Sequence, residues 1–206
     1  MAKLIQRYND QERMNHWVVA LLFCLAALSG LAFFHPSLFF LSNLFGGGPW
    51  TRILHPFIGV VMVLSFARLF LRFWRQNIMT AADKEWQAKM GEMLKGNKDA
   101  MPPVGKYNAG QKLVFWFSAG SLAVLLLTGL MFWRPWFAPY FPIVALRIAV
   151  LLHSVAAVVL VLSIVMHVYA AIWVKGTIRA MTRGTVTEGW AKANHPLWHK
   201  EVTGGR

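Results

Sequence analysis

The chain contains few acidic residues, few charges of any kind and only one cysteine. Its 206 residues include 8 Asp and Glu against 21 Lys and Arg, and charged residues make up only 14%. A soluble domain carries about 25% charged residues, so this deficit argues against a soluble globular protein. Cys24 alone excludes an internal disulfide, an iron–sulfur site built from this chain's own thiolates, and a Cys-x-x-Cys-His haem attachment. Thiols therefore carry no redox chemistry here.

The chain is correspondingly rich in hydrophobic residues. They account for 57% of the chain, above the roughly 45–50% of soluble domains, and this composition also excludes intrinsic disorder. The apolar residues gather in four runs, interrupted by a single charge at Arg68. The runs are His16–Phe34, Ile53–Leu71, Leu113–Trp133 and Ile148–Val174.

Each of the four runs is long enough to cross a membrane as a helix, which takes about 20 apolar residues. Four runs of this length with a single charge among them do not fit amphipathic helices of a soluble protein. We therefore predict an all-α membrane protein, with residues 1–206 forming a single domain and the spans forming a four-helix bundle. The predicted spans are about 16–34, 53–74, 112–133 and 147–174, with a loop at 75–111 and a tail at 175–206.

Most of the positive charges lie on one side of the predicted spans. With a cytoplasmic N-terminus, 18 of the 21 Lys and Arg residues and all eight acidic residues lie inside. Only Arg52, Arg134 and Arg147 lie outside. This bias predicts that both termini are cytoplasmic. The net charge of +13 therefore reflects membrane topology rather than nucleic-acid binding, and the nearly uncharged outer face indicates cover by a partner or by lipid.

A cleavable signal peptide is the alternative interpretation of the first run. Ala27-Leu28-Ser29 resembles a small-residue cleavage site. However, the 15 residues before the run contain acidic side chains, and the run exceeds the apolar region of a usual signal peptide. We expect the first run to remain as a span.

Four of the seven histidines lie in or at the edges of the spans, where ionisable side chains are costly and mark function. His16 begins the first span on the inner side, and His55 begins the second on the outer side. His153 and His167 are 14 residues apart on the fourth span, about 21 Å along the axis and nearly on one helix face. Each thus has a partner at its own depth, which predicts two bis-imidazole haem sites, one near each side of the membrane.

Other interpretations of the histidines are less consistent with the sequence. Zinc is disfavoured because no His-Glu-x-x-His motif occurs and no carboxylate or thiolate lies at the depth of the histidines. A proton relay or transporter would place Asp or Glu within the spans, and none is found there. A haem-free membrane anchor or transporter is the alternative from another functional class. We interpret His35 as an interfacial or hydrogen-bonded residue, and His195 and His199 as solvated residues of the tail.

Small residues beside the histidines suit a flat macrocycle packed against the backbone, although such residues also occur at ordinary contacts between membrane helices. The candidates are Ser29, Gly30, Gly59, Ser154, Ala156 and Ala157.

Several stretches of the chain resemble one family over about residues 7–202. They are RYNDQERMNHW, ILHPFIGVVM, GKYNAGQKLVFW, WRPWFAP, LLHSVAAV and MHVYAAIWVKGTIRAMTRGTVTEGWAKANHPLWHKEV. These stretches are similar to the gamma subunit, a di-haem cytochrome b, of the bacterial respiratory formate dehydrogenases of the N and O types. YNAGQK and VKGTIRAM discriminate best, whereas hydrogenase-type cytochromes b share a similar NHW opening. The loop from Trp74 to Val104 matches no motif.

The resemblance implies two sets of site residues. The axial ligands of two haem b groups fall on the outer pair His55/His153 and the inner pair His16/His167. A cytoplasmic quinone pocket, next to His167, falls on Asn108, Gly110 and Gln111. Amide side chains hydrogen-bond quinone carbonyls, and glycine admits close approach. The same stretch also suits a plain helix cap before the third span.

The function implied by the resemblance is electron transfer across the bacterial inner membrane. A molybdenum or tungsten alpha subunit oxidises formate outside, and an iron–sulfur beta subunit passes electrons to the outer haem. Electrons then reach the inner haem and reduce menaquinone or ubiquinone, with protons taken from the cytoplasm. The nearest alternative is the cytochrome b subunit of a membrane-bound nickel–iron hydrogenase. Arg52 and Arg147 are candidates for pairing with outer-haem propionates, although exposed loop cations explain them equally.

Overall fold

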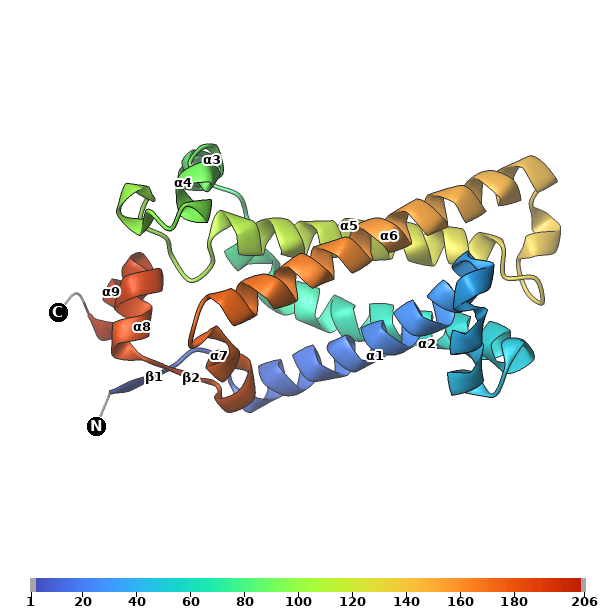
Figure 1. The fold of residues 1–206 in the computed structure, drawn as a ribbon, viewed down its shortest axis with the longest axis horizontal. Coiled ribbons are helices and arrows are strands. Elements are labelled where there is room, and N and C mark those ends of the chain that lie inside the picture. Colours follow the sequence, from blue (N-terminus) through green and yellow to red (C-terminus); the bar gives the residue numbers. More distant parts are fainter. Residues whose placement is uncertain (1–2, 205–206) are drawn as a thin grey trace. The chain divides into compact units, whose positions relative to one another are not determined.

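Four long helices dominate the computed structural model, which describes residues 3–204 apart from the side chain of Lys98. They are α1 (Asp10–Phe34), α2 (Gly48–Phe73), α5 (Ala109–Met131) and α6 (Ile143–Trp173) (Figure 1). All four are long and apolar enough to cross a membrane. This confirms the predicted helical architecture with four helices long and apolar enough to span a membrane. Arg206, which the charge count included, lies outside the described residues.

The long helices begin several residues before the apolar runs that predicted them. Hydropathy marks only the apolar part of a helix, whereas backbone hydrogen bonding continues into polar residues. At the start of α1, Asn9 and Glu12 form a reciprocal capping box. The Glu12 N–H donates to Asn9 Oδ1 at 2.8 Å and the Asn9 N–H donates to Glu12 Oε2 at 3.0 Å. Polar caps thus extend the helix beyond the run.

The described residues outside the long helices form short helices and one two-stranded ribbon. The ribbon was not predicted. The short elements are β1 (Leu4–Gln6), η1 (Pro36–Phe45), η2 (Trp74–Asn77), α3 (Ala81–Ala88), α4 (Met90–Leu94), η3 (Lys98–Ala100), η4 (Ala138–Tyr140), α7 (Thr177–Arg183), β2 (Thr185–Thr187), α8 (Glu188–Asn194) and α9 (Pro196–Thr203). β1 and β2 pair antiparallel with Ile5 opposite Val186. Gly184 precedes β2 at φ +75°, where an added Cβ would lie 2.6 Å from the Tyr8 carbonyl oxygen.

The chain divides into two compact units. The bundle unit comprises Met14–Leu71 and Phe117–Val165. Its core contains one buried residue from each long helix, and these four are Ala26, Met62, Leu122 and Leu160. The terminal unit comprises the described residues up to Arg13, Arg72–Trp116, and the described residues from Met166 onward. It therefore joins both ends of the chain to the segment between α2 and α5.

Candidate functional site

Two of the predicted ligands face each other inside the bundle unit. The imidazole rings of His55 on α2 and His153 on α6 have centroids 6.3 Å apart and an interplanar angle of 67°. A bond from a metal to an imidazole nitrogen is about 2.0–2.1 Å long, so two imidazoles on opposite sides of one ion have centroids about 6 Å apart. The spacing of the two rings thus fits the axial ligands of a single iron.

A buried hydroxyl lies within hydrogen-bond distance of the Nδ1 atom of each of these two rings. Ser29 Oγ lies 2.8 Å from His55 Nδ1, and Thr128 Oγ1 lies 3.0 Å from His153 Nδ1. Hydrogen bonding of this kind orients a metal-binding imidazole and leaves its second nitrogen available to the metal. Both imidazoles therefore have the hydrogen-bonded environment that is typical of metal-binding histidines.

A glycine follows each hydroxyl residue and lies against the same ring. A Cβ added at Gly30 would lie 3.2 Å from His55 Cε1, and one added at Gly129 would lie 3.2 Å from His153 Cε1. Both distances are shorter than ordinary carbon contacts, so the missing side chains let the rings approach the helices. The Ser29-Gly30 dipeptide on α1 and the Thr128-Gly129 dipeptide on α5 form equivalent seats for the two histidines.

Sequence reasoning identified only one of these two seats. Ser29 and Gly30 were candidates, whereas Thr128 and Gly129 were missed because α5 contains no histidine to draw attention to it. The available signal was a hydroxyl–glycine pair deep in an uncharged run, repeated on a second span. Gly59, another candidate, has open space where a side chain would lie.

The two inner ligands belong to different units of the chain. His16 lies near the start of α1 in the bundle unit, half-buried, with its ring 5.3 Å from that of Trp17. His167 is half-buried on α6 in the terminal unit. The pairing of His16 with His167 stays a prediction from their depths in the sequence.

Asn108 and Gln111 form a reciprocal cap at the start of α5. The Gln111 N–H donates to Asn108 Oδ1 at 2.9 Å, and the Asn108 N–H donates to Gln111 Oε1 at 3.0 Å. The helix-cap interpretation of this stretch is therefore correct. Because the two amide oxygens face the backbone, the two amide NH2 groups remain as donors, which is the type of group that binds a carbonyl oxygen.

Gly110 is packed beneath the indole of Trp86 from helix α3. A Cβ at Gly110 would lie 3.3 Å from the Trp86 ring and 3.4 Å from Asn108 Oδ1. Trp86 is 6% exposed. Within this structure, the group that approaches Gly110 closely is therefore the Trp86 ring.

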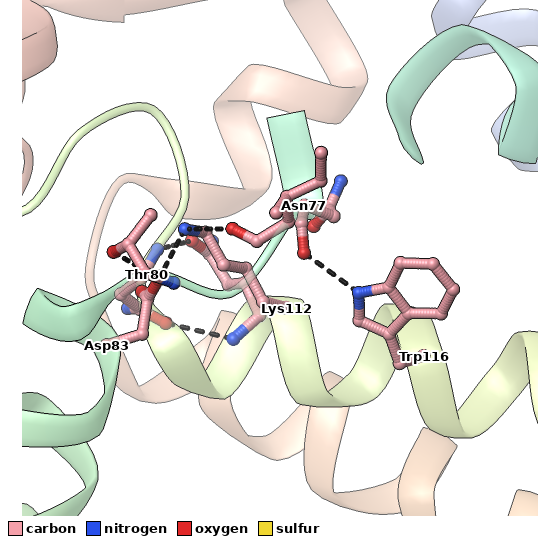
Figure 2. Close-up of polar contacts among 8 residues, drawn as sticks. Asn77, Thr80, Asp83, Lys112 and Trp116 are labelled. Carbon is pink, nitrogen blue, oxygen red and sulfur yellow. Dashed lines mark hydrogen bonds and ion pairs between the residues drawn. The ribbon is translucent and has the colours of Figure 1, made fainter. Parts of the chain in front are cut away.

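A buried ion pair fastens α3 to the beginning of α5 (Figure 2). Lys112 Nζ lies 2.6 Å from Asp83 Oδ2 and also donates to the Ile78 carbonyl at 3.1 Å. The Asp83 carboxylate accepts from the Thr80 N–H at 2.7 Å and thereby caps α3. Burial alone raises the pKa of Asp83, but the hydrogen bonds from Lys112 and Thr80 outweigh it and hold that pKa below its ordinary value. Trp116 adds a 2.8 Å bond to the Asn77 carbonyl.

The C-terminal tail closes over the segment that leads into this cap. The Leu197 N–H donates to the Val104 carbonyl at 3.2 Å. His195 Nδ1 donates to the Gly105 carbonyl at 2.8 Å, and the Arg7 guanidinium donates to the carbonyl of Lys106. Three consecutive carbonyls before Asn108 are therefore held by residues from the two ends of the chain.

The interpretation of His195 and His199 as solvated tail residues is wrong. They are only 3% and 7% exposed, because α8 and α9 fold back and bury them. Burial and then the nearby Arg7 lower the pKa of His195 to about 3, against the opposing bond to Gly105. His195 is therefore neutral, and its Nε2 accepts from Arg7 at 3.4 Å. His199 Nε2 lies 3.3 Å from Glu188 Oε1.

Arg7 lies in an aromatic cage in the terminal unit. Its guanidinium carbon is 4.8–5.9 Å from four ring centroids. The rings are those of Tyr8, Tyr107, Trp190 and Trp198. Lys106 lies over Tyr8, Phe73 and Tyr107, and burial lowers its pKa. Cation–π contacts of this number stabilise the packing of the tail against the N-terminal segment.

The two outer arginines lie on the surface. Arg52 and Arg147 are exposed, and within residues 3–204 neither forms an ion pair with a carboxylate. Their pairing with haem propionates stays a prediction.

Comparison with known proteins identifies the family. The model of the prokaryotic cytochrome b561 family matches residues 7–184. The chain is 47% identical over 198 residues to the formate dehydrogenase cytochrome b556(fdo) subunit of Escherichia coli K12, covering 96% of this chain and 93% of that protein. It is 43% identical over 201 residues to the nitrate-inducible cytochrome b556(Fdn) subunit of the same strain, covering 98% and 93%.

A third relative comes from another organism. The formate dehydrogenase cytochrome b556 subunit of Haemophilus influenzae is 42% identical over 197 residues, which cover 96% of this chain and 83% of that protein. The four membrane-crossing helices, the seated histidines and these matches agree with one another. The chain belongs to the prokaryotic cytochrome b561 family and is an integral membrane cytochrome b.

Proposed function

We propose that the chain is the membrane subunit of a formate dehydrogenase and conducts electrons from the outer face of the bacterial inner membrane to quinone on the cytoplasmic side. The similarity over 96% of the chain to a cytochrome b556 subunit of formate dehydrogenase carries the proposal. Formate oxidation belongs to a molybdenum or tungsten subunit, and an iron–sulfur subunit delivers the electrons. The chain's own reaction is the reduction of quinone.

The proposed cofactors are two haem b groups. His55 and His153 hold the outer one, and His16 and His167 hold the inner one. When bound, haem b supplies an iron that alternates between two oxidation states and carries single electrons. The seats formed by Ser29-Gly30 and Thr128-Gly129 support the outer pair, and the apolar helices exclude water from the path.

The proposed quinone site lies at the start of α5. The amide groups of Asn108 and Gln111 donate to a quinone oxygen and stabilise the negative charge that develops on it as electrons arrive. Gly110 admits Trp86, which packs against the cap. Reduction to the quinol consumes two electrons and two protons, and the protons come from the cytoplasmic side. The capping geometry supports this role because the amide oxygens accept from backbone N–H groups, which leaves the amide NH2 groups as donors for the quinone.

One experiment tests the proposal at its centre. The complex is purified through a tag on this chain, its partners are identified by mass spectrometry, and haem b is counted in the same sample by a pyridine haemochrome assay. We expect molybdopterin and iron–sulfur partners and two haems per chain. A nickel–iron partner supports the hydrogenase alternative instead, and fewer than two haems contradicts the ligand assignment.

A second experiment tests the pairing of the ligands. Each single change among His16→Ala, His55→Ala, His153→Ala and His167→Ala is expected to remove one haem. The His55 and His153 variants should lose the spectral signal of the same haem. The His16 and His167 variants should both lose the signal of the other haem. Any other grouping contradicts the proposed pairs.

A further inference from the structure

We infer that Ser29 and Thr128 are positioning residues that tune the redox potential of the outer haem, by accepting a hydrogen bond from each of its two axial imidazoles. The inference rests on the proposed ligation by His55 and His153. It concerns two residues on α1 and α5, the helices that supply no ligand to this haem.

The direction of the hydrogen bond at Ser29 follows from its neighbours. A serine hydroxyl has one hydrogen and two acceptor lone pairs. Ser29 Oγ lies 2.7 Å from the Leu25 carbonyl oxygen and 3.1 Å from that of Ala26, and both of these atoms are acceptors only. The hydroxyl hydrogen is therefore directed to the backbone, and a lone pair faces His55 Nδ1 at 2.8 Å. The imidazole must donate from Nδ1, which leaves Nε2 unprotonated for iron.

Thr128 repeats this arrangement at the second imidazole, that of His153. Its Oγ1 lies 2.6 Å from the Val124 carbonyl oxygen and 3.0 Å from His153 Nδ1. Ser29 is 0% and Thr128 7% exposed, so water does not compete for either bond. Both imidazoles are thus fixed in the Nδ1–H tautomer by the same chemistry.

Back-bonding to the preceding turn is common for hydroxyl residues in membrane helices, and Ser154 does the same with the Val150 carbonyl at 2.9 Å. What distinguishes Ser29 and Thr128 is the second bond to an imidazole, together with a glycine next in sequence. The missing Cβ of Gly30 and of Gly129 brings each ring against the helix. The seat is therefore built from two consecutive residues on each helix.

The hydroxyl acceptor affects the iron through the basicity of the imidazole. A hydrogen bond accepted from Nδ1–H increases electron density on the ring and makes Nε2 a better donor, which favours the ferric state. Removing the acceptor reduces this donation and is expected to raise the midpoint potential. Because the two hydroxyls act on opposite faces of one haem, their loss should be felt by that haem alone.

The test uses the complete purified complex and a potentiometric titration followed by optical spectroscopy, so that the readout is independent of formate oxidation. We expect Ser29→Ala and Thr128→Val each to raise one of the two midpoint potentials, and the double variant to raise the same one further. Thr182→Val removes a hydroxyl with the same kind of backbone bond, 3.1 Å from the Ile178 carbonyl, outside the spans and away from any proposed ligand, and Thr128→Ser retains the acceptor. Both should leave the two potentials unchanged.

Two further variants keep the test decisive. Ser29→Cys preserves the packing volume with a poorer acceptor, and it is expected to raise the same potential if Ser29→Ala does not assemble. His55→Ala, analysed in parallel, tests the ligation itself through the loss of one haem. If one haem is lost there but no acceptor variant shifts a potential, the inference is wrong while the ligation stands. If His55→Ala keeps both haems, the proposed ligation fails.

Discussion

Single glycines decide how close a ring can approach a helix in this protein, and their effect differs between positions. Gly30 lies against His55, where an added Cβ would come within 3.2 Å of the ring, whereas a Cβ added at Gly120 on α5 meets open space. We expect Gly30→Ala to displace His55 by a few tenths of an ångström and to weaken or abolish retention of one haem. Gly120→Ala is the matched control and should retain two haems. A pyridine haemochrome assay on both variants measures this, and equal haem content in the two contradicts the seat.

The side chain of Asn108 combines a structural and a proposed functional role that one substitution separates. Asn108→Asp keeps an oxygen to cap Gln111 but replaces the amide donor with a negative charge. A hydrogen bond to a charged group contributes about 1.5–3 kcal/mol, so quinone reduction should fall roughly 10- to 100-fold. Haem content and protein yield should stay unchanged. Asn108→Ser, which also caps, is the neutral control, and full quinone reductase activity in both variants rules out a donor role.

At the scale of elements, α3 is attached to α5 through one buried ion pair. Asp83 and Lys112 have side chains 6% and 10% exposed. Removing one partner leaves a buried unpaired charge, which costs about 3–5 kcal/mol. Asp83→Asn should therefore release α3, and limited proteolysis should then cut within residues 78–108. The double variant Asp83→Asn with Lys112→Met removes both charges and should restore much of the resistance. A double variant as sensitive as the single one indicates another form of attachment.

The docking of the tail helices depends on a neutral histidine. The pKa of His195 lies at about 3, well below its ordinary value of 6.5. Between these two values the released tail binds a proton that the docked tail does not, so stability falls as the pH decreases below 6.5. The loss reaches about 2 kcal/mol near pH 5. The protection factors of residues 196–203, which are exchange rates corrected for the intrinsic slowing of exchange at lower pH, should fall over this range. In His195→Asn, which does not titrate, this fall should be absent, and a wild-type tail whose protection is insensitive to pH contradicts the assignment.

The elements differ in how far the sequence predicts them. Hydropathy predicts the four long helices because lipid requires apolar surface along each of them, and the in-phase spacing of His153 and His167 is a local property of one helix. The seat at Thr128-Gly129 and the burial of His195 depend instead on which segments become neighbours. Composition and spacing do not encode that, because a hydroxyl beside a glycine and a histidine in a polar tail are common. The cap at Asn108 was an open alternative for the same reason.

At the scale of the whole molecule, the terminal unit constrains the topology independently of charge. β1 pairs with β2, and Arg7 and His195 bind the carbonyls of Lys106 and Gly105. We therefore expect the N-terminal segment, the segment between α2 and α5, and the tail to lie on one side of the membrane. Four membrane-crossing helices satisfy this condition. Any arrangement in which one of the four fails to cross separates these segments.

The side on which the terminal unit lies follows from the charges. The inner segments carry 18 of the 21 Lys and Arg residues, so we expect the terminal unit in the cytoplasm. Green fluorescent protein fused after the last residue should fluoresce in intact cells, and alkaline phosphatase at the same place should be inactive. Alkaline phosphatase fused after Gly47, beyond the first span, should be active because we expect that position to lie outside. An active phosphatase at the C-terminus would show that the protein has the opposite orientation in the membrane. Quinone reduction at Asn108 would then draw its protons from the opposite side.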